Sequence, residues 1–87
     1  MFLEIVTPEY KVFEGEVDSA IFPGSDGSFQ VLNSHAPMIS TLGKGAMTFV
    51  KLIEKRREEE TITVDGGVVE VRNNKVTVLA EKIVKED

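Results

Sequence analysis

The chain has 87 residues, of which 41% are hydrophobic and 29% charged, and this composition predicts one small, soluble and ordered domain. Its formal net charge of −5 disfavours nucleic-acid binding, which usually depends on a basic surface, and its lack of cysteine excludes disulfides and thiolate metal sites. No apolar run approaches the roughly 20 residues of a membrane-spanning helix, so direct insertion into a membrane is not expected.

In the first half of the chain, short runs of alternating apolar and polar residues predict β-strands. The runs are rich in Val, Ile, Phe and Thr, and they are separated by Gly, Pro, Asn or Asp. This pattern is typical of an all-β sandwich or barrel. The strands expected here span residues 2–6, 10–13, 16–22, 29–32 and 38–42, with breaks at Glu14-Gly15, Gly24-Ser25-Asp26-Gly27 and Gly43-Lys44-Gly45.

Residues 46–60, AMTFVKLIEKRREEE, fit two interpretations. The spacing of Met47, Val50 and Ile53 is compatible with a helix that continues into the strong helix formers after it. As strands, the segment alternates its faces and forms a long hairpin with residues 61–64, with KRREEE at its tip. We favour the hairpin, because a lone helix among strands would need a face to cover. A block whose charges cancel is more typical of a solvated hairpin end than of a binding patch.

The last third of the chain predicts the clearest hairpin. Residues 68–72 and 75–79 alternate as strands do, and they flank Asn73-Asn74, a pair that tolerates the positive φ of a type I′ turn. Asp65-Gly66-Gly67 predicts another tight connection before them. We expect a single all-β domain over residues 1–80, followed by a polar C-terminal tail over residues 81–87.

None of the motifs that could carry chemistry is complete. The Gly-rich turns lack both the spacing and the following helix of a phosphate-binding loop. Ser34 and the only histidine, His35, are adjacent and would point to opposite faces of a strand, and one histidine without cysteine cannot supply a zinc site. We therefore expect no catalytic residue, cofactor or metal, and we assign His35 a structural or interface role.

A lipoyl- or biotinyl-carrier module stays open as an alternative. Such carriers are also small β-sandwiches, and they present the modified lysine at an exposed hairpin tip. Lys44 lies at an expected turn, but glycines flank it on both sides, where carriers usually have Met or Asp and Ala.

Several segments, taken in order, resemble one family. Together they are similar to the N-terminal β-sandwich domain of the ε subunit of F-type ATP synthase, over nearly the whole chain. Ser28 and Asn33-Ser34 depart from the residues that the family usually has at these turns. The matching segments are LEIVTPE (3–9), FEG (13–15), GSDG (24–27), SHAP (34–37), GGVVEV (66–71) and VTVLA (76–80).

The resemblance implies a flattened ten-strand sandwich in the rotating central stalk of a proton-translocating ATP synthase, with no catalysis of its own. It implies docking on the γ subunit and on the c ring, at the cytoplasmic face of the inner (plasma) membrane, as a peripheral part of the complex. For the turn toward the c ring, tight-turn geometry alone is the other explanation. The matching positions are Ser25, Asp26, Gly27 and Ser28 toward the c ring, and Thr7, His35 and Ser40 toward γ.

Length is the main departure from the family. Typical members continue into two antiparallel helices, which can inhibit ATP hydrolysis and in some members bind ATP. Because the sequence stops at Asp87, it resembles the short forms that lack this helical hairpin. We therefore expect neither inhibition nor ATP binding from it.

Overall fold

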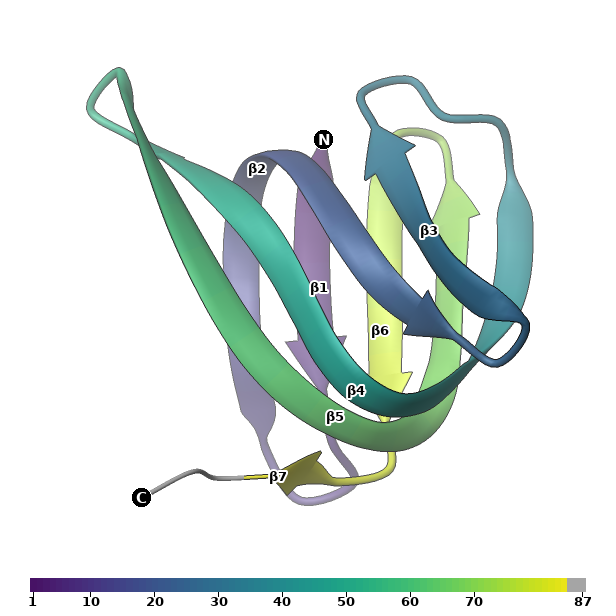
Figure 1. Cartoon of the computed structure of the whole chain (residues 1–87). Coiled ribbons are helices and arrows are strands. Elements are labelled where there is room, and N and C mark those ends of the chain that lie inside the picture. The colour runs from purple at the N-terminus through teal and green to yellow at the C-terminus, as the bar shows by residue number, and fades with distance from the viewer. Residues whose placement is uncertain (85–87) are drawn as a thin grey trace.

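The computed structural model of the chain describes residues 1–84, and residues 85–87 of the predicted tail lie outside the described residues. Within this range every regular element is a β-strand (Figure 1). No helix in the described part is long and apolar enough to cross a membrane. The strands are β1 (Phe2–Val6), β2 (Lys11–Gly24), β3 (Gly27–Leu32), β4 (Met38–Ile53), β5 (Arg56–Arg72), β6 (Lys75–Ala80) and β7 (Ile83–Val84).

The strands form one sheet that closes on itself. β1 pairs in parallel with β6 on one side and antiparallel with the start of β2 on the other. From β6 the order runs through antiparallel pairs to β5, β4, β2 and β3, and β7 pairs with β5. Closure through the β1–β2 pair removes the free edge that β1 would otherwise expose. The predicted all-β sandwich or barrel is confirmed.

Three long strands bend, so that each supplies a segment to both layers of the flattened barrel (Figure 1). The start of β2 pairs with β1, whereas its residues 17–24 pair with β4 and β3. β4 and β5 pair with each other from Met38↔Val71 to Ile53↔Arg56. The expected count of ten strands is therefore wrong. The described residues form seven, because β2, β4 and β5 continue through bends where separate strands were expected.

Three predicted breaks are wrong for the same reason. β2 runs through Glu14-Gly15, and β4 and β5 run through Gly43-Lys44-Gly45 and Asp65-Gly66-Gly67, with Lys44 paired to Asp65. The bend of β5 depends on Gly67, whose φ is +140° and where a Cβ would lie 2.3 Å from the carbonyl oxygen of Leu79. In these places glycine bends a strand that keeps its hydrogen bonds, and it does not end the strand.

The Asn73-Asn74 hairpin and the long hairpin of residues 46–64 are confirmed, and the helix considered for residues 46–60 is absent. The tip of the long hairpin is Glu54-Lys55, so only Lys55 of the KRREEE block lies in the turn. β4 and β5 join through Glu54-Lys55, and β5 and β6 join through Asn73-Asn74. Both residues of each pair have positive φ, as a type I′ turn requires. The KRREEE block starts in the first of these turns and continues along β5, so it is the end of a long hairpin that projects from the barrel (Figure 1).

The core lies between the two layers, and alternate residues of each strand fill it. Phe22 and Phe49 are its largest fully buried side chains, and the Phe13 ring packs 4.6 Å from the Phe49 ring, centroid to centroid. No polar or charged residue of the described chain is buried. The hydrophobic effect is therefore the main force holding the layers together. The buried residues are Met1, Leu3, Ile5, Val17, Ala20, Phe22, Val31, Leu42, Met47, Phe49, Val64, Val69, Val71, Val76, Val78 and Ala80.

Candidate functional site

The turn predicted to face a c ring joins β2 to β3 at one end of the molecule. Its shape depends on glycine, because a Cβ on Gly24 would lie 2.6 Å from the carbonyl oxygen of Gly27, and Gly27 has a φ of +125°. Ser25 ties the turn to β4. Its amide donates to the Thr41 carbonyl at 3.0 Å, and its Oγ accepts from Thr41 Oγ1 at 2.8 Å. Gly24, Gly27 and Ser25 thus have structural roles of their own.

The other two residues of this turn predicted to contact the c ring have solvent-exposed side chains. Asp26 and Ser28 are both exposed. Within residues 1–84 neither side chain makes a hydrogen bond or an ion pair. The carboxylate of Asp26 and the hydroxyl of Ser28 are therefore the groups of the turn that are available to a partner.

Thr7 lies in the short loop between β1 and β2, where its hydroxyl holds the loop together. Its Oγ1 accepts from the amides of Glu9 and Tyr10, at 3.3 and 3.1 Å, and its own amide donates to the Tyr10 carbonyl at 2.9 Å. Such bonds are a common local use of threonine in turns. The structure gives Thr7 this local role, and a contact with another subunit stays a prediction.

His35 and Ser40 lie away from Thr7. His35 is half-buried in the β3–β4 loop, with its Nδ1 2.7 Å from the carbonyl oxygen of Ala36. That loop is hydrogen-bonded to the β5–β6 turn, at the end of the layer opposite to the β1–β2 loop. Ser40 is half-buried on β4, and its hydroxyl donates to the next carbonyl at 3.2 Å. The three residues do not form one cluster.

An exposed apolar surface lies on the sheet face between these positions. We call it the apolar stripe, and it consists of Ile39, Val68, Leu79 and Val6 on four neighbouring strands. Val68 pairs with Leu79 and Leu79 with Val6, so these side chains point to the same side of the sheet. Ile39 is 70% exposed, Leu79 54% and Val68 37%. Apolar groups aligned and exposed in this way usually mark a contact surface.

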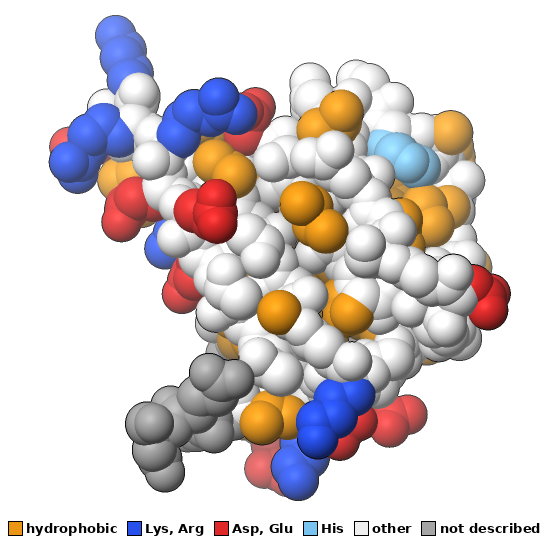
Figure 2. Space-filling model, viewed as in Figure 1, with side chains coloured by type: hydrophobic (Ala, Val, Ile, Leu, Met, Phe, Trp, Pro, Cys, Tyr) orange, Lys and Arg blue, Asp and Glu red, His pale blue; other side chains and the backbone are white. Residues whose placement is uncertain are grey.

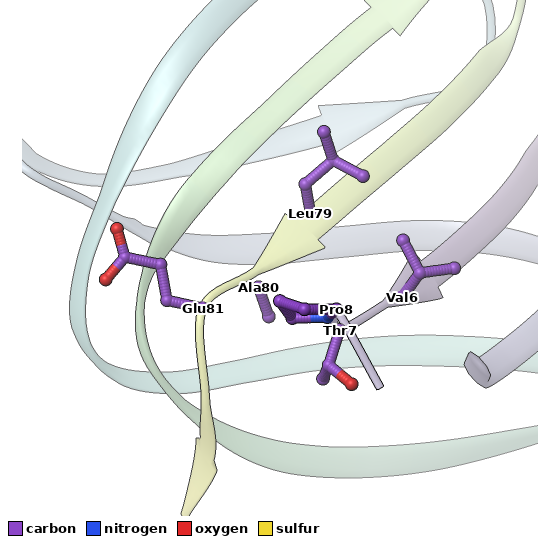
Figure 3. A pocket seen from close by; sticks show the side chains of 6 residues that line it. All are labelled: Val6, Thr7, Pro8, Leu79, Ala80 and Glu81. Carbon is purple, nitrogen blue, oxygen red and sulfur yellow. The ribbon is translucent and has the colours of Figure 1, made fainter. Parts of the chain in front are cut away.

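A shallow hollow of about 300 Å³ continues the stripe at its Val6 end (Figure 3). Figure 3 shows Thr7 and Pro8 between the ends of β1 and β6, with Leu79 and Val6 on the flanking strands. Glu81 stands at the rim. The hollow suits an apolar side chain of a partner, and it brings Thr7 to the edge of the same surface. The lining residues are Val6, Thr7, Pro8, Leu79, Ala80 and Glu81.

Charged residues lie beside the stripe on this sheet face. Lys11 forms ion pairs with Glu14 and with Glu4, the latter at 3.4 Å, and Lys75 lies 3.9 Å from the other oxygen of Glu4. The hydrogen bond to Glu14, followed by that to Glu4, raises the pKa of Lys11 above its ordinary value. Within the described residues no three His, Asp or Glu side chains are grouped so as to hold a metal ion. The arrangement is that of a contact face.

The apolar stripe was not predicted, although the sequence contains a signal for it. Val68-Val69 and Val78-Leu79 are adjacent apolar pairs inside strands, so one member of each pair must point away from the core. The partners of these strands cannot be identified from the alternation alone. For that reason the outward residues could not be assigned to one surface before the strand order was known.

Comparison with known proteins identifies the fold. Residues 1–86 match the model of the β-sandwich domain of the ATP synthase δ/ε chain. The ATP synthase epsilon chain of Leptospira borgpetersenii is 40% identical over 98% of this chain, and that of Chlorobaculum tepidum is 43% identical over 93% of it. The matched region covers 65% of the Leptospira chain and 89% of the Chlorobaculum chain, so this chain spans slightly less than two thirds of the former.

Two solved structures share the fold at low sequence identity. The central stalk and c ring of the Tetrahymena thermophila mitochondrial ATP synthase contain a chain that matches with a TM-score of 0.80 at 16% identity. The match covers 97% of this chain and 65% of that one. The Euglena gracilis mitochondrial enzyme gives a TM-score of 0.82 at 18% identity, over 94% and 51%. These likenesses confirm the architecture.

Proposed function

The chain belongs to the family of β-sandwich domains of ATP synthase δ and ε chains, and we propose that it is a non-catalytic part of the rotating central stalk of an F-type ATP synthase. In this role it joins the γ subunit to the c ring and helps to couple proton flow to ATP synthesis. The support for this role is the similarity to chains named ATP synthase epsilon chain, together with a sheet face suited to protein contact.

The apolar stripe is the observation that carries the proposed contact with γ. Ile39, Val68 and Leu79 are large, exposed and aligned across neighbouring strands. The His35 loop lies near one end of the stripe, and Thr7 lies at the other, beside the hollow. Ser40 follows Ile39 on β4, so its side chain points to the opposite side of the sheet from the stripe. Burial of these side chains against γ provides the hydrophobic part of the binding free energy, and the charged surroundings provide specificity.

The β2–β3 turn is the proposed contact with the c ring. Asp26 and Ser28 are exposed there, on a turn whose shape requires glycine and which the Ser25–Thr41 bonds tie to β4. The Asp26 carboxylate suits a basic group on a loop of the ring, as a charge-assisted contact. Through this complex the chain would be peripheral to the membrane, on the cytoplasmic face.

The carrier alternative depends on a lysine at an exposed hairpin tip, and Lys44 does not lie at one. The lysine of a carrier lies at a hairpin tip, whereas Lys44 lies inside β4 and pairs with Asp65 of β5. An unmodified mass for the purified protein would leave this alternative without support, and a lipoyl or biotinyl group on Lys44 would revive it.

The proposed function is tested with the purified cognate γ subunit. We expect the chain to co-elute with γ in size-exclusion chromatography at micromolar concentration, and Leu79→Glu to weaken the complex about tenfold or more, because a charge is placed in an apolar contact. Ile21→Glu is the matched control: Ile21 is 42% exposed but lies on β2, outside the stripe. Separate elution of the unaltered chain, or equal effects of the two substitutions, would count against the proposal.

A further inference from the structure

The β4–β5 hairpin projects from the barrel and carries exposed apolar and basic side chains at its end. We call this end the hairpin apex, and it comprises residues 52–57. Leu52 is 48% exposed and Ile53 38%. Figure 2 shows Lys and Arg side chains at the end of the projection, at the upper left. At the apex, basic residues and exposed apolar residues adjoin in sequence.

The charges divide along the hairpin. Lys51 pairs with Glu60 at 3.1 Å and Arg57 pairs with Asp18 of β2, so these two cations are already neutralised near the barrel. Within residues 1–84, Lys55 and Arg56 form no ion pair. Within the same residues Glu54, the other residue of the turn, forms no ion pair either. The apex therefore presents two cations beside one carboxylate, a net positive charge at the end of a chain whose formal net charge is −5. Glu58 and Glu59, further down β5, would repel an acidic partner that approached from the side, so such a partner would meet the apex end-on.

The turn at the apex has residues that its geometry does not favour. Glu54 and Lys55 have φ values of +48° and +67°. This region suits Gly or Asn, and a residue with a long side chain is uncommon in it. The same molecule uses Asn73-Asn74 for its other type I′ turn. Residues that conflict with local geometry are a reason to look for a use of their side chains.

We propose that the hairpin apex is a second protein-contact surface, which binds an acidic surface of the γ subunit. Lys55 and Arg56 supply the charge attraction, and Ile53 and Leu52 supply the apolar contact beside it. This inference rests on the proposed function, because it places a second contact on the same partner. It is separate from the apolar stripe and from the β2–β3 turn, which lies on the far side of the molecule from the apex in Figure 1.

A second contact would help the chain in its proposed role as a rotor part that transmits torque. A part held only through the stripe could pivot about that single patch when torque is applied. A second attachment, on a projection away from the patch, resists this rotation with a longer lever arm. Exposed charges at the rim of a contact act mainly on the rate of association and on its salt dependence. The association rate constant and its salt dependence are therefore the quantities that test the apex contact.

The test measures association of the intact chain with purified cognate γ at about 0.02 M and about 0.5 M salt, by stopped-flow fluorescence. We expect Lys55→Glu/Arg56→Glu to lower the association rate constant about tenfold at low salt and less than about twofold at high salt. Lys44→Glu/Lys82→Glu is the matched control. It changes the net charge by the same amount, at two exposed lysines outside the stripe and the apex, and we expect less than a twofold effect.

The outcomes separate this inference from the proposed function. If the unaltered chain does not bind γ, the proposed function fails before the apex is tested, and this inference falls with it. If the chain binds γ and the apex variant associates as fast as the unaltered chain at low salt, the apex contact alone is wrong. Equal slowing by the apex and control variants would also overturn it, because net charge would then explain the result. Equal thermal unfolding temperatures of all three proteins establish that the variants are folded.

Discussion

The molecule has two hairpins closed by the same kind of two-residue turn, and they differ in the residues that form it. Asn73-Asn74 joins β5 to β6, and Glu54-Lys55 joins β4 to β5, with each φ between +48° and +67°. Asn adopts this conformation more readily than most residues, whereas Glu and Lys seldom adopt it. The first turn follows the preference of its geometry and the second opposes it.

Contacts with the rest of the molecule explain the difference. Asn74 accepts from the Ser34 amide at 2.8 Å through Oδ1, and its Nδ2 donates to Asn33 Oδ1 at 2.9 Å. Its carbonyl accepts from the Phe2 amide at 3.1 Å. Within the described residues, neither Glu54 nor Lys55 has a side-chain bond of this kind. Side-chain and backbone bonds thus tie the Asn73-Asn74 turn to the body of the molecule, whereas the Glu54-Lys55 turn projects from it.

The largest contrast is expected between the base and the apex of the long hairpin. Phe49 lies at the base, is fully buried and packs on Phe13, so Phe49→Ala should lower the free energy of unfolding by about 3–5 kcal/mol. Leu52→Ala in the apex should change it by only about 0.5 kcal/mol, because the side chain is about half exposed and lies outside the core. Urea denaturation measures both. A cost for Leu52→Ala close to that of Phe49→Ala would mean that the apex belongs to the core.

The Asn73-Asn74 turn is anchored to the β3–β4 loop by the bonds of Asn74, so its side chains should contribute more to the free energy of unfolding than those of the Glu54-Lys55 turn. Asn74→Ala removes two hydrogen bonds and places Ala at a φ of +59°, so we expect a loss of about 2 kcal/mol. Asn73→Ala has a similar φ, +50°, without those tertiary bonds, and should cost about 1 kcal/mol. The difference between the two losses, measured by chemical denaturation, gives the contribution of the Asn74 side-chain hydrogen bonds. Equal losses would show that the bonds to Asn33 and Ser34 contribute nothing.

Substitutions in the projecting Glu54-Lys55 turn should stabilise the protein. Glu54→Asn/Lys55→Gly gives it residues that suit positive φ, and we expect the free energy of unfolding to rise by about 1 kcal/mol. Thermal unfolding followed by circular dichroism measures the change, with Glu58→Gln as a control for loss of one exposed charge. A decrease in stability would mean that Glu54 and Lys55 stabilise the turn through their side chains, and the contrast between the hairpins would not hold.

Much of the fold could be predicted because it depends on local patterns. Alternation within short runs predicted the strands, and Asn73-Asn74 predicted its turn, since a type I′ turn needs only two residues with positive φ. The bends at Gly43-Lys44-Gly45 and Gly66-Gly67 were mistaken for turns. Glycine signals an unusual backbone conformation in both cases, and whether a strand ends or bends there depends on pairing with a distant strand.

The candidate site was less accessible to prediction for the same reason. The apolar stripe depends on the parallel pairing of β1 with β6, which joins opposite ends of the chain and leaves no trace in local sequence. Thr7 stays a prediction as a contact residue, and its hydroxyl bonds within its own loop are not visible in the sequence. Asp26 stays a prediction as a contact residue, supported by its exposure on a turn that is bonded to β4.

The smallest expected effect is a change in the pKa of Lys11. Lys11 shares the carboxylate of Glu4 with Lys75, which directly follows the Asn73-Asn74 turn. The pKa of Lys11 is raised above 10.5, first by Glu14 and then by Glu4, so Glu14→Gln should lower it more than Glu4→Gln. A titration followed by NMR of the lysine side chains measures both shifts. Because the folded-state pKa is the higher one, the stabilisation is complete below about pH 10.5 and is lost as the pH rises through the folded-state value. Because Lys11 is exposed, its contribution to the free energy of unfolding is small and is screened by salt. A larger pKa shift for Glu4→Gln than for Glu14→Gln would contradict the prediction, and it would show that Lys11 interacts chiefly with Glu4, the partner that it shares with Lys75.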